Sequence, residues 1–123
     1  MISTRLEGRI ILVVEDDYLV GEMLADLLVS AGAIVIGPIG WLEEAMGMAE
    51  DDGCVFDTAI LDINLHGSLS YPLVDLLTAR QIAVIFATGY GAGSIDTSYQ
   101  HHPRCTKPFT WVSLLAALDN AAI

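Results

Sequence analysis

Short apolar runs alternate along this chain with longer segments in which apolar residues recur every three or four positions. The runs are Ile10–Val14, Ala33–Ile36, Thr58–Leu61, Ile82–Ala87 and, more weakly, Arg104–Thr106. Runs of this length that are rich in β-branched residues predict strands buried on both faces of a sheet. None of them approaches the ~18 residues that a membrane span requires.

The segments between the runs have the apolar spacing of amphipathic helices. They are predicted over Leu19–Ala31, Leu42–Ala49, Leu73–Leu77 and Trp111–Leu118, with Trp41 and Trp111 expected to pack against helices. Gly32 is a candidate C-terminal cap of the first helix, and Gly37-Pro38 punctuates the second strand. The glycines between residues 89 and 93 disfavour a helix before the last strand. Five strands alternating with helices predict a doubly wound α/β fold with a parallel sheet covered on both faces.

Length and charge limit the classes of function. The 123 residues correspond to one domain, and 54% of them are hydrophobic while only 17% are charged, as in a compact globular chain. The formal net charge of −11 argues against binding to nucleic acid or to an anionic membrane surface. The N-terminal residues lack the apolar region of a signal peptide, so we expect a cytoplasmic protein without a membrane partner.

Chemically active side chains follow the predicted strands. Glu15 and Asp16 come after the first, Asp62 after the third, Thr88 after the fourth and Lys107 after the fifth. In parallel α/β sheets, ligands bind beyond the carboxyl ends of the strands, so these five side chains are expected to meet at one rim. Carboxylate oxygens suit Mg²⁺, a carboxylate can act as a nucleophile, and a hydroxyl and an ammonium can stabilise a transferring phosphoryl group.

Each of these residues also has an ordinary structural explanation. Acids at residues 15 to 17 could cap the helix that follows, and Asp62 could be a turn residue. Thr88 could close a turn, and Lys107 could be a surface charge. These explanations are reasonable one at a time, but all of them would have to hold at the same rim. Lys107 is also the only lysine in the sequence, which favours a specific role.

Four stretches carry a resemblance to a known family. They are Ile11-Leu12-Val13-Val14-Glu15-Asp16-Asp17, Ala59-Ile60-Leu61-Asp62-Ile63-Asn64-Leu65, Phe86-Ala87-Thr88-Gly89-Tyr90 and Thr106-Lys107-Pro108-Phe109. In this order they resemble the receiver domain of two-component response regulators, over essentially the whole chain. The Phe-Ala-Thr-Gly-Tyr run is similar to a subgroup of stand-alone receivers, associated with HWE and related histidine kinases, although Ala83-Val84 stands where that motif has Pro-Phe.

The resemblance implies a flavodoxin-like (βα)5 three-layer sandwich with strand order 2-1-3-4-5. It implies that Asp62 accepts a phosphoryl group, with Thr88 as the switch hydroxyl and Lys107 as the phosphate-pairing lysine. Glu15, Asp16, Asp62 and the backbone carbonyl of Asn64 would hold Mg²⁺, and the Lys107–Pro108 bond would be cis.

Two positions, His66 and Arg104, depart from the family pattern. His66 stands where most receivers have proline, so a freer loop is expected after Asp62. Arg104 occupies the usual place of a switch aromatic, and a guanidinium is costly to bury. Tyr90 is a candidate for the missing moving aromatic or for a static lid, and the glycine-rich segment after it is expected to be mobile.

The sequence therefore predicts a single receiver domain over residues 1–123, without an output domain, in a monomer or weak homodimer. A histidine kinase or phosphotransfer protein would donate the phosphoryl group, and the output would be a protein contact or a phosphate sink. Two alternatives remain at this stage. One is a pseudo-receiver that acts as an interaction module without phosphorylation, and the other is a small flavodoxin-like enzyme that turns over phosphate substrates.

Overall fold

The computed structural model describes residues 5–53, 55–89, 95–107 and 109–120. Five parallel strands form the main sheet: β1 (Ile10–Val14), β2 (Ile34–Ile39), β3 (Thr58–Asp62), β6 (Ala83–Thr88) and β7 (Arg104–Thr106). Their order is β2-β1-β3-β6-β7, which confirms the predicted order because β6 and β7 are the fourth and fifth strands of this sheet. Two further strands, β4 (Asn64–Leu65) and β5 (Ser68–Leu69), form a small antiparallel hairpin that the sequence did not predict.

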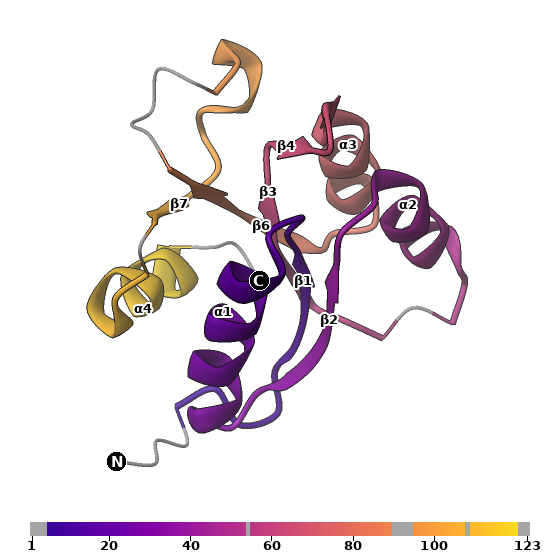
Figure 1. Ribbon diagram of the computed structural model, residues 1–123. Coiled ribbons are helices and arrows are strands. Elements are labelled where there is room, and N and C mark those ends of the chain that lie inside the picture. Colours follow the sequence, from indigo (N-terminus) through magenta and orange to yellow (C-terminus); the bar gives the residue numbers. More distant parts are fainter. Residues whose placement is uncertain (1–4, 54, 90–94, 108, 121–123) are drawn as a thin grey trace.

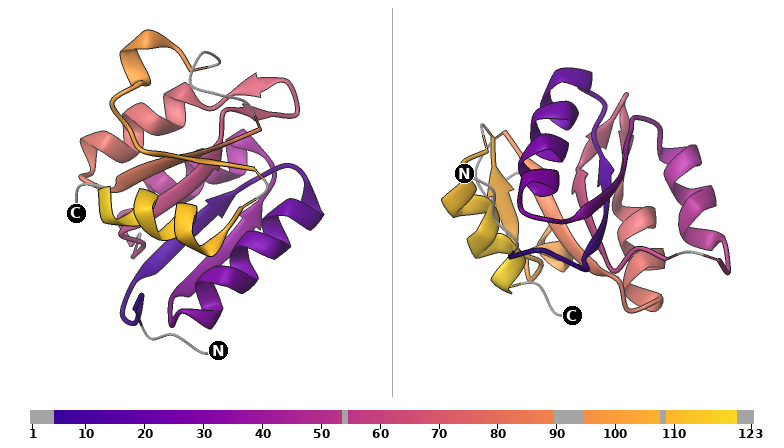
Figure 2. Two further views of the ribbon diagram at one scale, coloured as in Figure 1. Left: turned by 90° about the vertical axis from the view of Figure 1, so that its left-hand side faces the viewer. Right: turned by 90° about the horizontal axis from the view of Figure 1, so that it is seen from below.

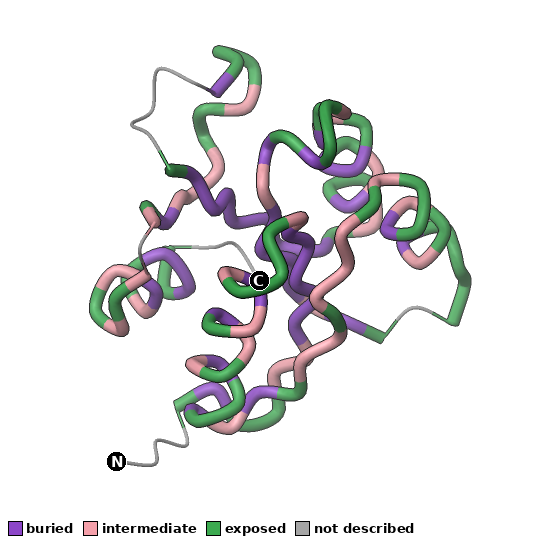
Figure 3. Tube along the Cα trace, viewed as in Figure 1, coloured by how far each residue is buried: buried purple, intermediate pink, exposed green. Residues whose placement is uncertain are grey.

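Helices cover both faces of the sheet, as Figures 1 and 2 show. One face carries α1 (Tyr18–Ser30) and α4 (Trp111–Asn120), and the other carries α2 (Leu42–Glu50) and α3 (Tyr71–Ala79). Two apolar clusters fill the spaces between the layers, one on each face of the sheet. The central strands are the most buried part of the chain, and Ile11 to Val14 are fully buried, as their unbroken apolar run predicts (Figure 3).

The second strand differs from the prediction. Gly37-Pro38 does not end it, because β2 continues to Ile39. Ile36 pairs with Leu12 and Ile39 with Val14, so two residues of β2 lie opposite one of β1 in a bulge. A bulge accommodates a proline, which has no N–H for the ladder, and here the bulge brings the end of β2 to Glu15, whose N–H donates to the Ile39 carbonyl over 2.9 Å.

The connection from β6 to β7 contains, in its described residues 89 and 95–103, one short 3-10 helix, η2 (Thr97–Tyr99), and no α-helix. This agrees with the expectation that the glycines disfavour a helix there. Tyr99 stacks on Tyr71 of α3 with ring centroids 4.4 Å apart, and the Asp96 N–H donates to the Tyr71 hydroxyl over 2.8 Å. The expected mobility after Tyr90, and Tyr90 itself, lie outside the described residues.

Among the described helices, none is long and apolar enough to cross a membrane. Trp111 packs against the cluster beneath α1 and α4, as expected for a helix-packing residue. The same expectation is wrong for Trp41, because its residue is 56% exposed and its ring stacks on His66 instead.

The bulge in β2 leads to a prediction about stability. Gly37 has a φ of +109°, and a Cβ placed on it would lie 2.5 Å from the Val13 carbonyl oxygen. Gly37→Ala is therefore expected to lower the free energy of unfolding by about 2–4 kcal/mol, through strained backbone and a clash with a buried strand.

Gly47 is the matched control, because it lies within α2 and a Cβ there meets nothing within 4 Å. Gly47→Ala is expected to raise the free energy of unfolding by about 0.5–1 kcal/mol through helix propensity. Urea denaturation measures both variants. Equal effects of the two substitutions would contradict this description of the bulge.

Candidate functional site

Three carboxylates meet at the carboxyl end of the sheet. Glu15 and Asp16 follow β1, and Asp62 is the last residue of the adjacent strand β3. One oxygen from each of these side chains lies within 4.8 Å of one oxygen from each of the others. The parallel pairing of β1 with β3 causes this convergence, since both strands end at the same edge of the sheet.

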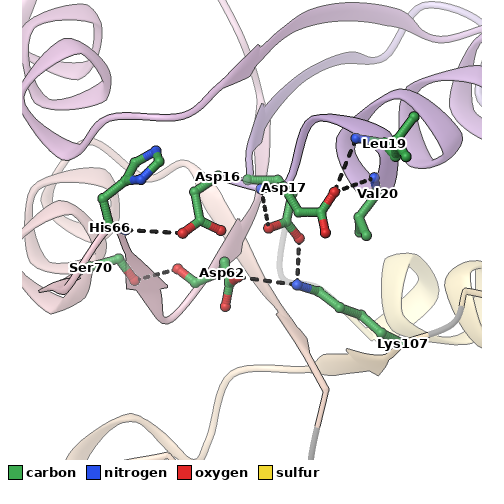
Figure 4. Close-up of polar contacts among 9 residues, drawn as sticks. Asp16, Asp17, Leu19, Val20, Asp62, His66, Ser70 and Lys107 are labelled. Carbon is green, nitrogen blue, oxygen red and sulfur yellow. Dashed lines mark hydrogen bonds and ion pairs between the residues drawn. The ribbon is translucent and has the colours of Figure 1, made fainter.

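Lys107 supplies the positive charge at this site. Its Nζ lies 2.5 Å from Oε1 of Glu15 and 3.1 Å from Oδ2 of Asp62. Figure 4 shows the Lys107 side chain extending toward Asp62. The residue follows β7, and its N–H donates to the carbonyl of Thr88 over 2.8 Å, which extends the pairing of β6 with β7. The Lys107–Pro108 bond, expected to be cis, lies outside the described residues.

Glu15 is the most deeply buried of the three acids, with 3% of its surface exposed. Burial raises its pKa from 4.5 to about 7, and the negative charge of Asp62 acts in the same direction. The Lys107 ammonium and the Asp17 N–H, which donates to Oε2 over 3.2 Å, lower the pKa but do not offset burial. For Lys107, burial acts to lower the pKa, but the two neighbouring carboxylates outweigh it and raise the pKa.

Asp16 is held by the hairpin. The His66 N–H donates to its Oδ2 over 3.0 Å, as Figure 4 shows. Partial burial acts to raise the Asp16 pKa, but the His66 N–H and further hydrogen bonds outweigh burial and lower it. Its carboxylate is therefore favoured in the charged form, as a metal ligand must be.

Asp17 has a different role from its two neighbours. Its Oδ1 accepts hydrogen bonds from the N–H groups of Leu19 and Val20 at 3.1 and 3.3 Å, so it is the N-cap of α1. The capping explanation for the acidic run is thus right for Asp17, whereas Glu15 and Asp16 lie at the site.

Thr88 ends β6 and is buried at the same edge of the sheet. Asn64 begins β4, two residues beyond Asp62, and its Oδ1 accepts from the Gly67 N–H over 2.8 Å. The structure thus brings all the residues predicted for the site to the carboxyl edge of four neighbouring strands, β1, β3, β6 and β7, and to the loops that follow them.

The loop after Asp62, expected to be freer because His66 stands where most receivers have proline, contains a short hairpin. Residues 64–69 form the hairpin, with His66 and Gly67 at its turn at φ values of 51° and 88°. Ser70, which the sequence analysis did not single out, fastens its far end. The Ser70 side chain is buried, and its Oγ donates to the Asp62 carbonyl over 2.7 Å.

Comparisons with known proteins place the chain in a family. No protein-family model matches the sequence, and a search of curated proteins finds no match. Solved structures do match. SdrG from Sphingomonas melonis Fr1 is 37% identical, with 91% of this chain and 94% of SdrG covered and a TM-score of 0.81. The BeF3-activated conformation of SdrG is 35% identical, with 98% of both chains covered and a TM-score of 0.77.

Two more distant structures share the fold. The response regulator PhyR from Brucella abortus is 25% identical over 91% of this chain, which spans 46% of PhyR, with a TM-score of 0.75. The receiver domain of the sensor histidine kinase PA1611 from Pseudomonas aeruginosa PAO1 is 21% identical, over 91% of this chain and 95% of that one, with a TM-score of 0.73. This chain belongs to the receiver-domain family of response regulators.

The buried Glu15 carboxyl leads to a prediction about pH dependence. Its folded pKa of about 7 lies above the ordinary 4.5, so the folded chain keeps this proton to higher pH than the unfolded chain does. Stability is consequently lost as the pH rises through this window, by up to about 3 kcal/mol relative to a chain without the carboxyl.

We therefore expect wild type to lose stability relative to Glu15→Gln between pH 5 and 8, in metal-free buffer. Chemical denaturation at several pH values measures the difference. Glu44→Gln, at an exposed position of α2, reports the effect of removing one surface charge. A stability difference between wild type and Glu15→Gln that does not change with pH would contradict the prediction.

Proposed function

We propose that this protein is a single-domain response regulator that accepts a phosphoryl group on Asp62 in a reaction that depends on Mg²⁺. The observation that carries the proposal is the position of the Lys107 ammonium, in contact with both Glu15 and Asp62 at the mouth of the acidic cluster. A carboxylate nucleophile, a cluster of metal-ligand type and a cation for the incoming phosphate are the parts that phosphoryl transfer requires.

The residues fit a divalent metal ion. Three carboxylates have come together, and Lys107 is the cation that contacts two of them. One ammonium leaves a formal charge of about −2 when all three acids are ionised, and like charges this close repel one another. Oε1 of Glu15 is buried and, among the described residues, has the ion pair with Lys107 but no hydrogen bond of good geometry. A hard cation with oxygen ligands would satisfy this oxygen.

Glu15, Asp16 and Asp62 would hold Mg²⁺ together with the Asn64 backbone carbonyl. When bound, Mg²⁺ would supply positive charge that offsets the charge of the phosphoryl group beside these acids. The PA1611 receiver domain has a magnesium ion coordinated in its active site cleft. That similarity supports the choice of metal.

Asp62 would act as the nucleophile. An oxygen of its carboxylate would form a bond to phosphorus as the bond from phosphorus to the donor's imidazole nitrogen breaks, and the electron pair of that bond would return to the histidine. Lys107 would pair with one phosphoryl oxygen and Thr88 would donate a hydrogen bond to another. The donor would be a histidine kinase or a phosphotransfer protein in the cytoplasm.

The output would be a contact with another protein, or the chain would serve as a phosphate sink. The relation to SdrG, which has a BeF3-activated conformation, supports a protein that changes shape on phosphorylation. Arg104 does not offer the aromatic ring of the usual switch. Its guanidinium donates instead to the Gln100 carbonyl over 2.8 Å, on the segment that leads into β7.

The proposal predicts the response to beryllofluoride, which mimics an aspartyl phosphate. With Mg²⁺ present, beryllofluoride is expected to shift backbone amide signals of residues near the ends of β3, β6 and β7. Two-dimensional NMR of the labelled chain measures these shifts.

Asp62→Asn is expected to abolish the response, while Asp57→Asn, at the opposite end of β3, is expected to retain it. Because Asp57 forms an ion pair with Arg9, thermal unfolding checks separately that the Asp57→Asn variant is folded. The absence of a response in wild type would favour a pseudo-receiver, and steady turnover of free phosphate esters would favour an enzyme. Either result would overturn the proposal.

A further inference from the structure

An aromatic stack lies beside the acidic cluster. The rings of Trp41 and His66 have centroids 3.8 Å apart and an interplanar angle of 17°. Trp41 comes from the connection between β2 and α2, and His66 from the turn between β4 and β5. The stack therefore joins two loops that are separated by 25 positions in the sequence and lie on the same side of the site.

Trp41 has no other evident structural purpose among the described residues. It occupies the N-cap of α2, where small polar residues are preferred, and its side chain makes no capping hydrogen bond. The residue is 56% exposed, so it contributes little to the core. Stacking on His66 is the interaction that explains a large aromatic ring at this position.

His66 connects the stack to the acidic cluster through its backbone. Its N–H donates to Oδ2 of Asp16, as Figure 4 shows. The residue before Trp41 also lies close by, because a Cβ placed on Gly40 would be 3.7 Å from Nε2 of His66 and 3.8 Å from Cα of Asp16. The loop that carries Trp41 thus lies close to both the His66 ring and the Asp16 backbone.

Hydrogen bonds fix the hairpin at its turn and at its far end. The Asn64 side chain closes the turn through the Gly67 N–H, and Ser70 fastens the far end of the hairpin to the Asp62 carbonyl. The turn residue His66 has a φ of 51°, in the left-handed region where Asn, Asp and His are the most frequent residues after glycine. Its ring packs against Trp41.

We infer that the Trp41–His66 stack is a clamp that holds the Asp16 carboxylate in its metal-binding orientation. Trp41 and His66 are positioning residues, because neither contributes a ligand and both act through the His66 N–H. The inference rests on the proposed function, in which Asp16 is a ligand of Mg²⁺. Partners that orient metal ligands commonly change metal affinity by about 10- to 100-fold, and an exposed stack should lie at or below that range.

A double-mutant cycle tests the clamp by its effect on metal affinity. Trp41→Ala removes one ring, and His66→Asn removes the other while retaining a residue that tolerates positive φ. Each is expected to weaken Mg²⁺ binding, measured by calorimetry, by about 3- to 10-fold. Either substitution breaks the same stack, so the double variant is expected to lose no more Mg²⁺ affinity than one single variant does. Independent effects would instead multiply the two fold-losses.

Leu69→Ala is the matched control, since Leu69 is an exposed apolar residue of the same hairpin and the stack consists of Trp41 and His66. It is expected to leave Mg²⁺ affinity unchanged. Unchanged affinity in both Trp41→Ala and His66→Asn, or effects that multiply in the double variant, would overturn the clamp.

A second measurement needs no metal. In a Trp111→Phe background, Trp41 is the sole tryptophan, and its emission reports the stack. Asp16→Ala removes the acceptor for the His66 N–H and is expected to shift the Trp41 emission in metal-free buffer, whereas Asp16→Asn retains an acceptor and is expected to shift it less. Equal emission in Asp16→Ala and the parent would overturn the clamp.

The two measurements also separate the clamp from the proposed function. If the parent chain binds no Mg²⁺ but Asp16→Ala still shifts the Trp41 emission, the coupling of the stack to Asp16 holds and the metal-dependent function fails. If the parent binds Mg²⁺ and the clamp variants bind it equally well, the clamp fails and the function stands.

Discussion

The ion pairs of Lys107 with Glu15 and Asp62 are the interaction on which the rest of the site depends. They join the ends of β1 and β3 to the residue that follows β7, at the far side of the sheet. The Lys107 side chain reaches them because its backbone N–H is fixed on the Thr88 carbonyl. Without this cation, three carboxylates at mutual distances within 4.8 Å would repel one another, and the buried Glu15 would favour its neutral form still more strongly.

The predictable part of the site follows from topology. Apolar runs without polar interruptions predicted central strands, and parallel strands must end at one edge. The topology alone therefore predicts that Glu15, Asp16, Asp62 and Lys107 lie together. The sequence could not separate the roles of the three consecutive acids. Asp17 caps α1 through two backbone N–H groups, while its neighbours turn toward Lys107 and His66, and only the geometry of the turn decides this.

The unpredicted features depend on contacts between distant residues. Strands of two residues have no measurable periodicity, so β4 and β5 were missed, although His66-Gly67 between Leu65 and Ser68 has the glycine of a tight hairpin turn. The sequence predicts helix packing for Trp41, because its actual partner is 25 positions away in this hairpin turn. It predicts a strand end at Gly37-Pro38, since a sequence pattern does not distinguish a bulge within a strand from a break.

The connection between β6 and β7 differs from the usual receiver pattern, because Arg104 stands where a switch aromatic is expected. Arg104 binds the Gln100 carbonyl, and Tyr99 of the same segment stacks on Tyr71 of α3. A change at Thr88 would therefore act on a segment already anchored to α3.

The central claim, that Asp62 accepts the phosphoryl group, is tested most directly by chemical mapping. The chain is incubated with Mg²⁺ and acetyl phosphate, reduced with borohydride, which converts an aspartyl phosphate to homoserine, and digested for mass spectrometry. The account predicts homoserine at position 62 alone, and unmodified Asp62 or modification at another acid would contradict it.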